Sequence, residues 1–425
     1  MIKQLSILNL FGRFDYPLIF KNGGVTILTG PNGFGKSTIL DIINAISKSD
    51  LNFFFNLDFG EIEFQFDDDS ILKLRKSNEK LYIDDIVLTI PSAKDYNLFS
   101  LKPHIYPRYE DYYKIAASQA LRGEKVSDYL DIIDFDFLRD KEFPAIMFSN
   151  LNAKQTAKLK SKLKLIQQQC GKVRLISEQR LIQKKNNEDN QEIIDSITEL
   201  PKKLKKEISK VTEEYSKVAN KLDSSYPRRL LTANAGLSSI DEYNEKLKEA
   251  NNKFMKLSEY NLVHIQLLDS KNYDEKYSTA LMIYFEDFTS KYKVFEELIA
   301  KLDLFTDIIN HRLSFKKLKI SSQNGFNVVD IDDSKKDLDL SKLSSGEKQE
   351  IVLFYELIFN VDSELLLLID EPEISLHITW QKKFLEDLLR VTKRSELEVI
   401  VATHSPQIIN NNWDLQIDLG EIYGK

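Results

Sequence analysis

Apolar residues in the first ninety positions follow the period of β-strands. Residues 2–9 alternate between apolar and polar, residues 25–29 are a continuous apolar run, and residues 61–88 contain three further alternating segments. The run 36–46 has helical spacing instead. Alternation at a period of two is typical of strands with one buried face. This part of the chain therefore predicts an antiparallel layer next to a strand and a helix.

Strands return after residue 313. Residues 315–331 contain two alternating segments, and residues 364–370 (ELLLLID) and 398–403 (EVIVAT) are almost wholly apolar. Residues 346–360, before the first of these two apolar runs, have helical spacing, and so do residues 378–394 between the two runs. Continuous apolar strands that alternate with helices predict a parallel sheet covered on both faces. After His404 the segment WDLQIDL reads as one closing strand of that sheet.

The middle of the chain has helical periodicity. Between residues 190 and 222 apolar residues repeat with the 4,3 spacing of heptads, and residues 275–313 contain a second such stripe. The first stripe consists of Leu204, Ile208, Val211, Tyr215, Val218 and Leu222. Fewer than three clean heptads, with Pro201 before them, favour an ordinary helical bundle over a projecting rod.

These patterns predict an α/β fold whose two ends form one domain around a helical insertion. We expect residues 1–180 to form the N-terminal half, with an irregular and helical region at 90–170. Residues 181–314 would form the helical or short coiled-coil insertion, and residues 315–425 the C-terminal half.

Composition narrows the class of protein. The 425 residues are 42% hydrophobic and 29% charged, which is typical of a folded domain, and no run reaches the about 18 apolar residues of a membrane helix. The N-terminus lacks the features of a secretion signal. One cysteine, Cys170, excludes an internal disulfide. We expect a cytoplasmic protein that binds no membrane, and its net charge of −7 argues against a non-specific nucleic-acid coat.

The run VTILTGPNGFGKST, residues 25–38, fits GxxxxGK[ST] between an apolar strand and a helix. In such a loop, backbone N–H groups and the helix N-terminus surround nucleotide phosphates, and Lys36 adds a positive charge. The Ser37 hydroxyl is the expected ligand for Mg²⁺ in this motif. The predicted nucleotide-binding residues here are Asn32, Gly33, Gly35, Lys36, Ser37 and Thr38.

An acidic pair follows the apolar strand of LLLLIDEPE. Asp370, at the strand end, is placed to hold Mg²⁺, and Glu371 is placed to polarise an attacking water. The simpler alternative is a strand end with acidic turn residues. The P-loop in the same chain favours the catalytic interpretation, so ATP and Mg²⁺ are the expected substrate and metal.

The run KLSSGEKQE, residues 342–350, reads equally as a capped helix start. Its place between the P-loop and the acidic strand, with His404 after the next strand, resembles the motif order of ABC-type ATPase heads. The SSGE form, rather than SGGQ, is similar to the branch that contains SMC, RecF and OLD proteins. That resemblance implies two heads that enclose the nucleotide in a homodimer or larger homo-oligomer.

The same resemblance implies roles for several residues. Ser344, Ser345 and Gly346 would face the γ-phosphate held by a partner head, and Glu347 of the same motif is a further nucleotide-binding candidate. His404 would sense the γ-phosphate in its own head. His377 lies either at the head interface or merely at a helix start.

A glutamine that links the nucleotide and Mg²⁺ to the helical lobe is also implied. Gln179, after a strand-like segment, is the candidate and Gln65 the competitor. Arg180 could reach a phosphate or pair with a carboxylate.

The combination of GPNGFGKST, LSSGEKQE, DEPEISLHITWQ and ATHSPQII resembles the AAA15/AAA21 group of bacterial ATPases found in anti-phage defence systems such as PARIS and Septu. It implies a regulatory ATPase that gates a separate nuclease-like effector when a phage protein triggers it. About twenty residues follow His404, too few for a metal-dependent nuclease domain, so we expect that output on another chain.

A DNA-binding repair ATPase of the SMC or RecF kind is the alternative. Lysine-rich stretches at 154–164 and 202–210 could track phosphates, although such runs are more often solvated helix faces. Nucleic acid is therefore a possible but not the primary partner.

Overall fold

The computed structural model describes residues 2–21, 24–77, 80–89, 153–176, 182–187, 190–233, 235–263, 273–333, 337–360, 365–374, 376–395 and 397–424. The chain forms two compact units. The first consists of residues 1–176, 363–372 and 396–425, and the second of residues 177–362 and 373–395. The division at residues 180 and 314 stays a prediction.

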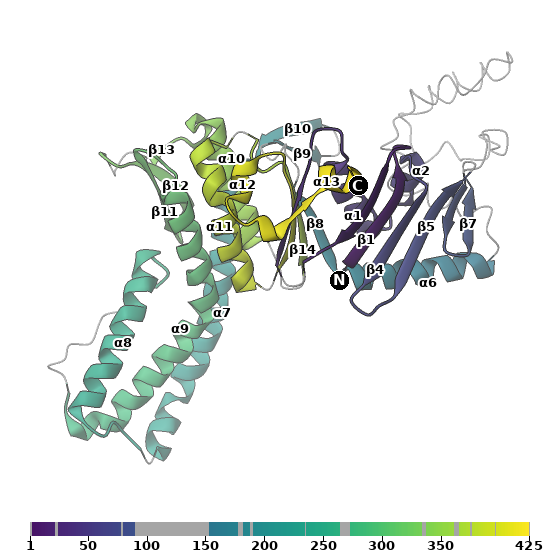
Figure 1. Ribbon diagram of the computed structural model, residues 1–425. Coiled ribbons are helices and arrows are strands. Elements are labelled where there is room, and N and C mark those ends of the chain that lie inside the picture. The colour runs from purple at the N-terminus through teal and green to yellow at the C-terminus, as the bar shows by residue number, and fades with distance from the viewer. Residues whose placement is uncertain are drawn as a thin grey trace. The chain divides into compact units, whose positions relative to one another are not determined.

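The first unit contains a five-stranded parallel sheet. Its strands, in spatial order, are β16 (Gln416–Asp418), β3 (Val25–Thr29), β15 (Glu398–Ala402), β14 (Leu365–Asp370) and β8 (Lys172–Ile176), of which β8 and β14 are labelled in Figure 1. All its neighbouring strands are parallel. β3 is buried throughout, because an inner strand with both faces covered needs apolar side chains on each. The predicted parallel sheet and its closing strand are confirmed.

A six-stranded antiparallel sheet completes the first unit. Its strands, in spatial order, are β2 (Phe14–Ile19), β1 (Ile2–Leu10), β4 (Glu61–Phe66), β5 (Ile71–Ser77), β6 (Lys80–Ile83) and β7 (Ile86–Thr89). Helices α1 (Lys36–Lys48), α2 (Leu51–Asn56) and α6 (Ala153–Cys170) share one apolar core with both sheets. The helix that follows the P-loop is thereby fixed on both sides.

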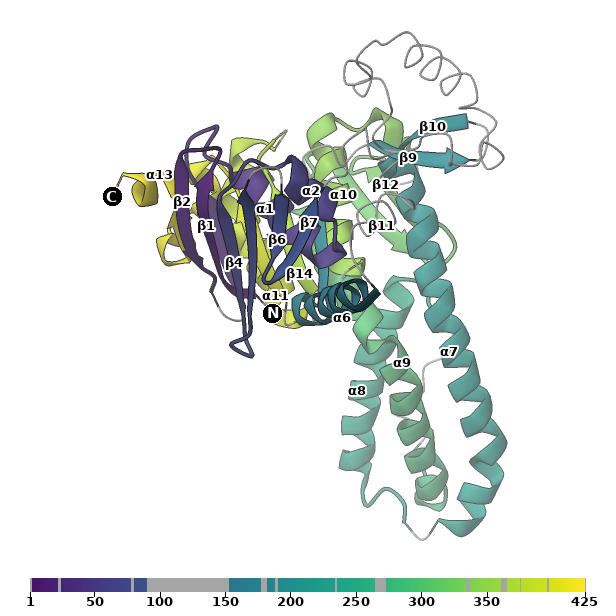
Figure 2. The same cartoon turned by 90° about the vertical axis from the view of Figure 1, so that its right-hand side faces the viewer.

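Three helices form a long arm in the second unit (Figure 2). They are α7 (Ser196–Thr232), α8 (Ile240–Glu259) and α9 (Ser278–Asn310). α7 packs beside α9, where the rings of Tyr215 and Phe295 are 5.1 Å apart. Its 37 residues correspond to about 55 Å. The arm is thus longer than the ordinary bundle that we expected.

The difference arises at Pro201, which we expected to stop the helix. α7 begins at Ser196 and continues through Pro201. Gly325, the first residue of β12, packs closely against this part of α7. A Cβ added to Gly325 would collide with the Pro201 carbonyl oxygen. Gly325 also has a φ of 74°, which favours glycine. Tertiary packing therefore supports the helix where proline removes a hydrogen-bond donor.

The rest of the second unit surrounds the base of the arm. It contains the sheet β11 (Lys316–Ser321), β12 (Gly325–Asp330) and β13 (Asp337–Leu338), the hairpin β9 (Ile182–Asn187) and β10 (Asn190–Asp195), and helices α10 (Ser345–Phe359) and α11 (Ile378–Ser395). Short elements complete both units: 3-10 helices at Glu275–Tyr277, Leu340–Lys342 and Trp413–Leu415, and helices α12 (Pro406–Ile409) and α13 (Leu419–Tyr423).

Most of the predicted irregular region, residues 90–152, lies outside the described residues, and its remainder forms α6. Among the helices that the structure describes, none combines the length and the apolar character needed to cross a bilayer.

Candidate active site

The P-loop connects the end of β3 to the start of α1. Gly33 and Gly35 adopt φ angles of 85° and 81°, the left-handed region in which a Cβ is costly. Space is also short at Gly35, where an added Cβ would lie 3.2 Å from Leu10 Cδ2. The loop therefore needs glycine for its conformation and for its packing under β1. The N-terminus of α1 follows directly after the loop, and a helix N-terminus binds anions well.

Lys36 is the first residue of α1 and is 5% exposed. Its Nζ donates to the carbonyl oxygen of Gly30 at 3.0 Å and lies 3.7 Å from Glu371 Oε1. The ammonium group is thus held over the loop that it would serve. Its countercharge in this structure is the candidate catalytic carboxylate.

Ser37 and Asp370 meet although they are 333 positions apart. The Ser37 hydroxyl donates to Asp370 Oδ1 at 3.0 Å. Register places Asp370 at the end of β14, opposite Ala402 of β15. A hydroxyl and a carboxylate are hard oxygen donors of the kind that Mg²⁺ accepts, so the residues fit that metal.

A further carboxylate lies near this pair and was missed from the sequence. Burial, and after it the negative charge of Asp370, raises the pKa of Asp41 above its usual range. Asp41 lies on α1, one helical turn beyond Ser37. A lone aspartate on an amphipathic helix carries no spacing rule that would identify it. Only the fold shows that it faces another acid.

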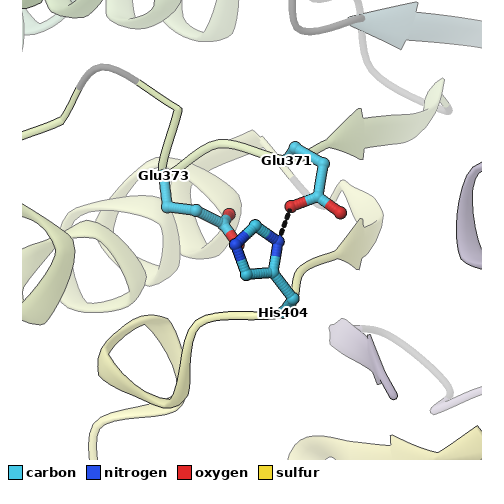
Figure 3. A group of neighbouring side chains, drawn as sticks. All are labelled: Glu371, Glu373 and His404. Carbon is cyan, nitrogen blue, oxygen red and sulfur yellow. Dashed lines mark hydrogen bonds and ion pairs between the residues drawn. The ribbon is translucent and has the colours of Figure 1, made fainter. Parts of the chain in front are cut away.

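Glu371 and His404 form a direct contact (Figure 3). His404 Nδ1 and Glu371 Oε2 are 2.5 Å apart, and the backbone N–H of Glu371 donates to the Ala402 carbonyl oxygen at 2.9 Å. Glu371 has a φ of 44°, a strained conformation for a residue with a side chain. Such strain at a strand end is frequent at functional sites. The two predicted catalytic residues are thus brought together beside the P-loop lysine.

The residues of the SSGE motif belong to the second unit. Ser344 is the N-cap of α10, and Glu347 completes a capping box with it. Ser345 is exposed, whereas Glu347 is 8% exposed. Both interpretations of this motif remain compatible with the geometry, because a capped helix start presents N–H groups to an anion.

The remaining predicted residues have mixed outcomes. Gln179 and Arg180 lie outside the described residues. Gln65 lies in β4, and its amide donates to Asp69 at 3.4 Å in the turn that follows. His377 precedes α11 and contacts the Thr379 hydroxyl through Nδ1 at 2.9 Å. A local contact of this kind fits the helix-start interpretation of His377.

The two lysine-rich stretches are partly paired with acids in the described residues. Lys158 and Lys162 of α6 contact Asp85 and Asp84, and Lys202 contacts Glu199 at 2.9 Å. These contacts are typical of solvated helix faces, for which the charges are mutually compensated.

An aromatic cluster holds the P-loop from its outer side. Phe34, inside the loop, packs against Phe14 with ring centroids 5.2 Å apart and against Tyr423 at 5.8 Å. The Tyr16 hydroxyl donates to the Phe34 carbonyl oxygen at 2.9 Å. Burial, with a smaller effect of Tyr423, raises the pKa of Tyr16 to about 12, so the phenol stays a donor.

A polar network joins the C-terminal strand to the base of the same loop. Thr29 donates to Asp418 at 3.1 Å, and the Gln416 amide donates to Thr29 at 2.6 Å. These three residues, with Gly30 and His404, line a pocket of about 340 Å³. The aromatic cluster and this network both depend on residues close to the end of the sequence, and no local motif indicates either.

Comparison with known proteins identifies the family. The AAA ATPase domain family AAA_15 matches residues 1–409. The zinc import ATP-binding protein ZnuC of Rickettsia conorii is 33% identical over 84 residues, which are 20% of this chain and 35% of ZnuC. The chain therefore matches about a third of the length of this curated relative.

Solved SMC head domains are also similar. The Smc head of Pyrococcus furiosus, with an extended coiled coil and bound to the C-terminal domain of ScpA, is 14% identical, with a TM-score of 0.39. The match covers 96% of this chain and 91% of that one. The SMC head of Thermotoga maritima is 11% identical, with a TM-score of 0.33 over 96% and 90% of the two chains. With the family match over nearly its whole length, the chain belongs to the AAA ATPase domain family.

Proposed function

We propose that the P-loop, Asp370 and Glu371 form a Mg²⁺-dependent site for ATP. The observation that carries this proposal is the bond between Ser37 and Asp370, together with Lys36 held over the loop. The phosphates would bind to the backbone and side chains of Asn32, Gly33, Gly35, Lys36, Ser37 and Thr38. Ser37 and Asp370 would hold Mg²⁺, which neutralises phosphate charge when bound. Gln179 stays a proposed ligand of the nucleotide and the metal.

Glu371 acts as the group that polarises water, and His404 orients it. Glu371 lies between Lys36 and His404. A γ-phosphate is the natural partner of Lys36 and would compete with Glu371 for it. ATP binding would thereby release one carboxylate oxygen while His404 retains the other.

The heads act as a pair, with Ser344, Ser345 and Gly346 facing the nucleotide of a second copy. The support is the exposed N-terminus of α10, because the N-terminal end of a helix favours an anion. A Glu371→Gln variant should bind ATP without hydrolysing it and so accumulate the dimer. Sizing with ATP tests this: a Glu371→Gln variant that stays as small as the nucleotide-free protein contradicts the paired site. Lys36→Ala in the same background is the control that should not dimerise.

The biological role we propose is that of a regulatory ATPase subunit in bacterial anti-phage defence. The combination of motifs resembles that of the PARIS ATPase AriA and, as a second choice, that of the Septu ATPase PtuA. In this role, ATP-driven assembly of the heads scaffolds a separate nuclease-like effector and releases it when a phage protein acts as trigger. Co-expression with the product of the neighbouring gene, followed by affinity purification, tests this. Absence of any stable partner in both ATP states would count against it.

A DNA-binding ATPase of repair is the second candidate, and the long arm of α7 and α9 favours it. A gel shift with long duplex DNA separates the two. ATP-dependent retention of DNA by the purified protein alone would support the repair role. Partner binding without DNA retention would support the defence role.

A further inference from the structure

A lysine outside the SSGE motif forms an ion pair with the glutamate of the motif. Lys316, the first residue of β11, donates from Nζ to both carboxylate oxygens of Glu347 at 2.9 Å. The Lys316 side chain is 28% exposed and that of Glu347 is 9% exposed. A bidentate contact with a mostly buried carboxylate is a defined position, unlike most surface ion pairs.

Glu347 in turn organises Ser344. Its Oε2 accepts from the Ser344 backbone N–H at 2.9 Å and from the Ser344 hydroxyl at 3.0 Å. Burial would raise the pKa of Glu347, but the bonds from Lys316 and Ser344 outweigh burial and lower it. The carboxylate is therefore a fixed negative charge within the first turn of α10.

A second cation from the same segment holds the next turn of the helix. Arg312 Nε lies 3.0 Å from Glu350 Oε2, and its guanidinium lies 4.5 Å from the centre of the Phe354 ring. Arg312 follows the end of α9, and Lys316 is the first residue of β11, four positions later. One short segment at the base of the arm thus fixes α10 at residues 347, 350 and 354.

This arrangement solves an electrostatic problem. A helix N-terminus attracts phosphate, but an unpaired carboxylate in its first turn repels it. We propose that Lys316 is a positioning residue for ATP hydrolysis: it neutralises Glu347, so that the α10 N-terminus can face the phosphates bound by a second copy of the chain. The inference rests on the proposed paired site and assigns a role to a residue outside every recognised motif.

The first test is Lys316→Met, compared with Lys317→Met on the same strand, whose side chain is exposed. Lys316→Met should lower kcat about tenfold and leave KM for ATP within about twofold, because the P-loop is untouched. In a Glu371→Gln background it should raise the Kd of the ATP-dependent dimer by about tenfold, a typical effect of losing a charge-assisted contact. Lys317→Met should match wild type in both measurements.

Two further variants separate charge from general stability. Lys316→Arg keeps the charge and should restore most of the activity. Glu347→Gln added to Lys316→Met removes the stranded carboxylate and should recover dimerisation, if neutralisation is what Lys316 supplies. Failure of both to rescue would overturn the inference, even if Lys316→Met itself folds poorly.

Ser345→Glu distinguishes this inference from the proposed function. An acid is well tolerated in the first turn of a helix, but it places a negative charge on the exposed face of the motif. If Ser345→Glu abolishes dimerisation while Lys316→Met behaves as wild type, the paired site stands and the role of Lys316 is refuted. If neither variant changes dimerisation or kcat, the paired site itself is refuted.

Discussion

Arg312 offers a sharp test of how the base of the arm is stabilised. It is 4% exposed and lies between Glu350 and Asp387, with its Nη2 atom 2.5 Å from Asp387 Oδ2. Replacing it by methionine would keep most of the volume but would remove the guanidinium that both Asp387 and Glu350 contact. Removing one partner of a buried pair costs about 3–5 kcal/mol. Arg390 is the matched control, because it also binds Asp387 but its side chain is 44% exposed, so Arg390→Met should cost at most about 1 kcal/mol.

The assay can be restricted to the second unit. The chain has two tryptophans, of which Trp380 lies on α11 in that unit and Trp413 lies in the first unit. In a Trp413→Phe background, Trp380 fluorescence therefore reports urea unfolding around Asp387. With an m-value of about 2–3 kcal/mol/M, Arg312→Met should lower the midpoint by roughly 1–2 M. Equal shifts for Arg312→Met and Arg390→Met would refute the reasoning that burial decides the cost.

Three further predictions follow from the same contacts. Burial raises the pKa of Glu350 to about 8, against the lowering effect of Arg312. The contribution of protonated Glu350 to the free energy of unfolding is therefore complete below about pH 4.5 and is lost as pH rises through about 8. Urea midpoints measured between about pH 5 and 9 should show this decline in the wild type, and Glu350→Gln should remove it. Lys36→Ala should abolish ATP binding, and unchanged affinity by calorimetry would contradict the P-loop assignment. Tyr423→Ala, which removes two ring contacts to the P-loop cluster, should weaken ATP binding about threefold to tenfold by calorimetry, whereas Tyr277→Ala should not.

The sequence predicts the first unit well because its evidence is local. β3 and β14 are continuous apolar runs, and parallel pairing of buried strands brings their carboxyl ends to one edge. That rule alone places Asp370 near the P-loop. The bond between Ser37 and Asp370 is then a consequence of register rather than of any further motif.

Other contacts of the site lie beyond such rules. Tyr423 reaches Phe34 across nearly the whole length of the chain, and Lys316 reaches Glu347 through a strand that carries two other lysines. The alternation of apolar and polar residues identifies that strand, but it does not show which of its lysines pairs with an acid. Pro201 shows the opposite error, since a local rule predicted a break and the packing of Gly325 against α7 overrides it.

The composition of α10 indicates why its contacts matter for more than stability. The helix is almost entirely buried, yet it buries Glu347, Glu350 and Glu356 among its apolar residues. Apolar side chains of similar volume would often be as stable or more stable than buried ion pairs, so stability alone does not account for these acids. Two of the three pair with cations from the segment that directly follows α9. A helix fixed by directional ion pairs keeps one register, and a displacement of α9 would change both pairs together. The ion pairs of α10 therefore fix the start of this helix in one orientation on the segment that follows α9, which apolar contacts alone would not specify.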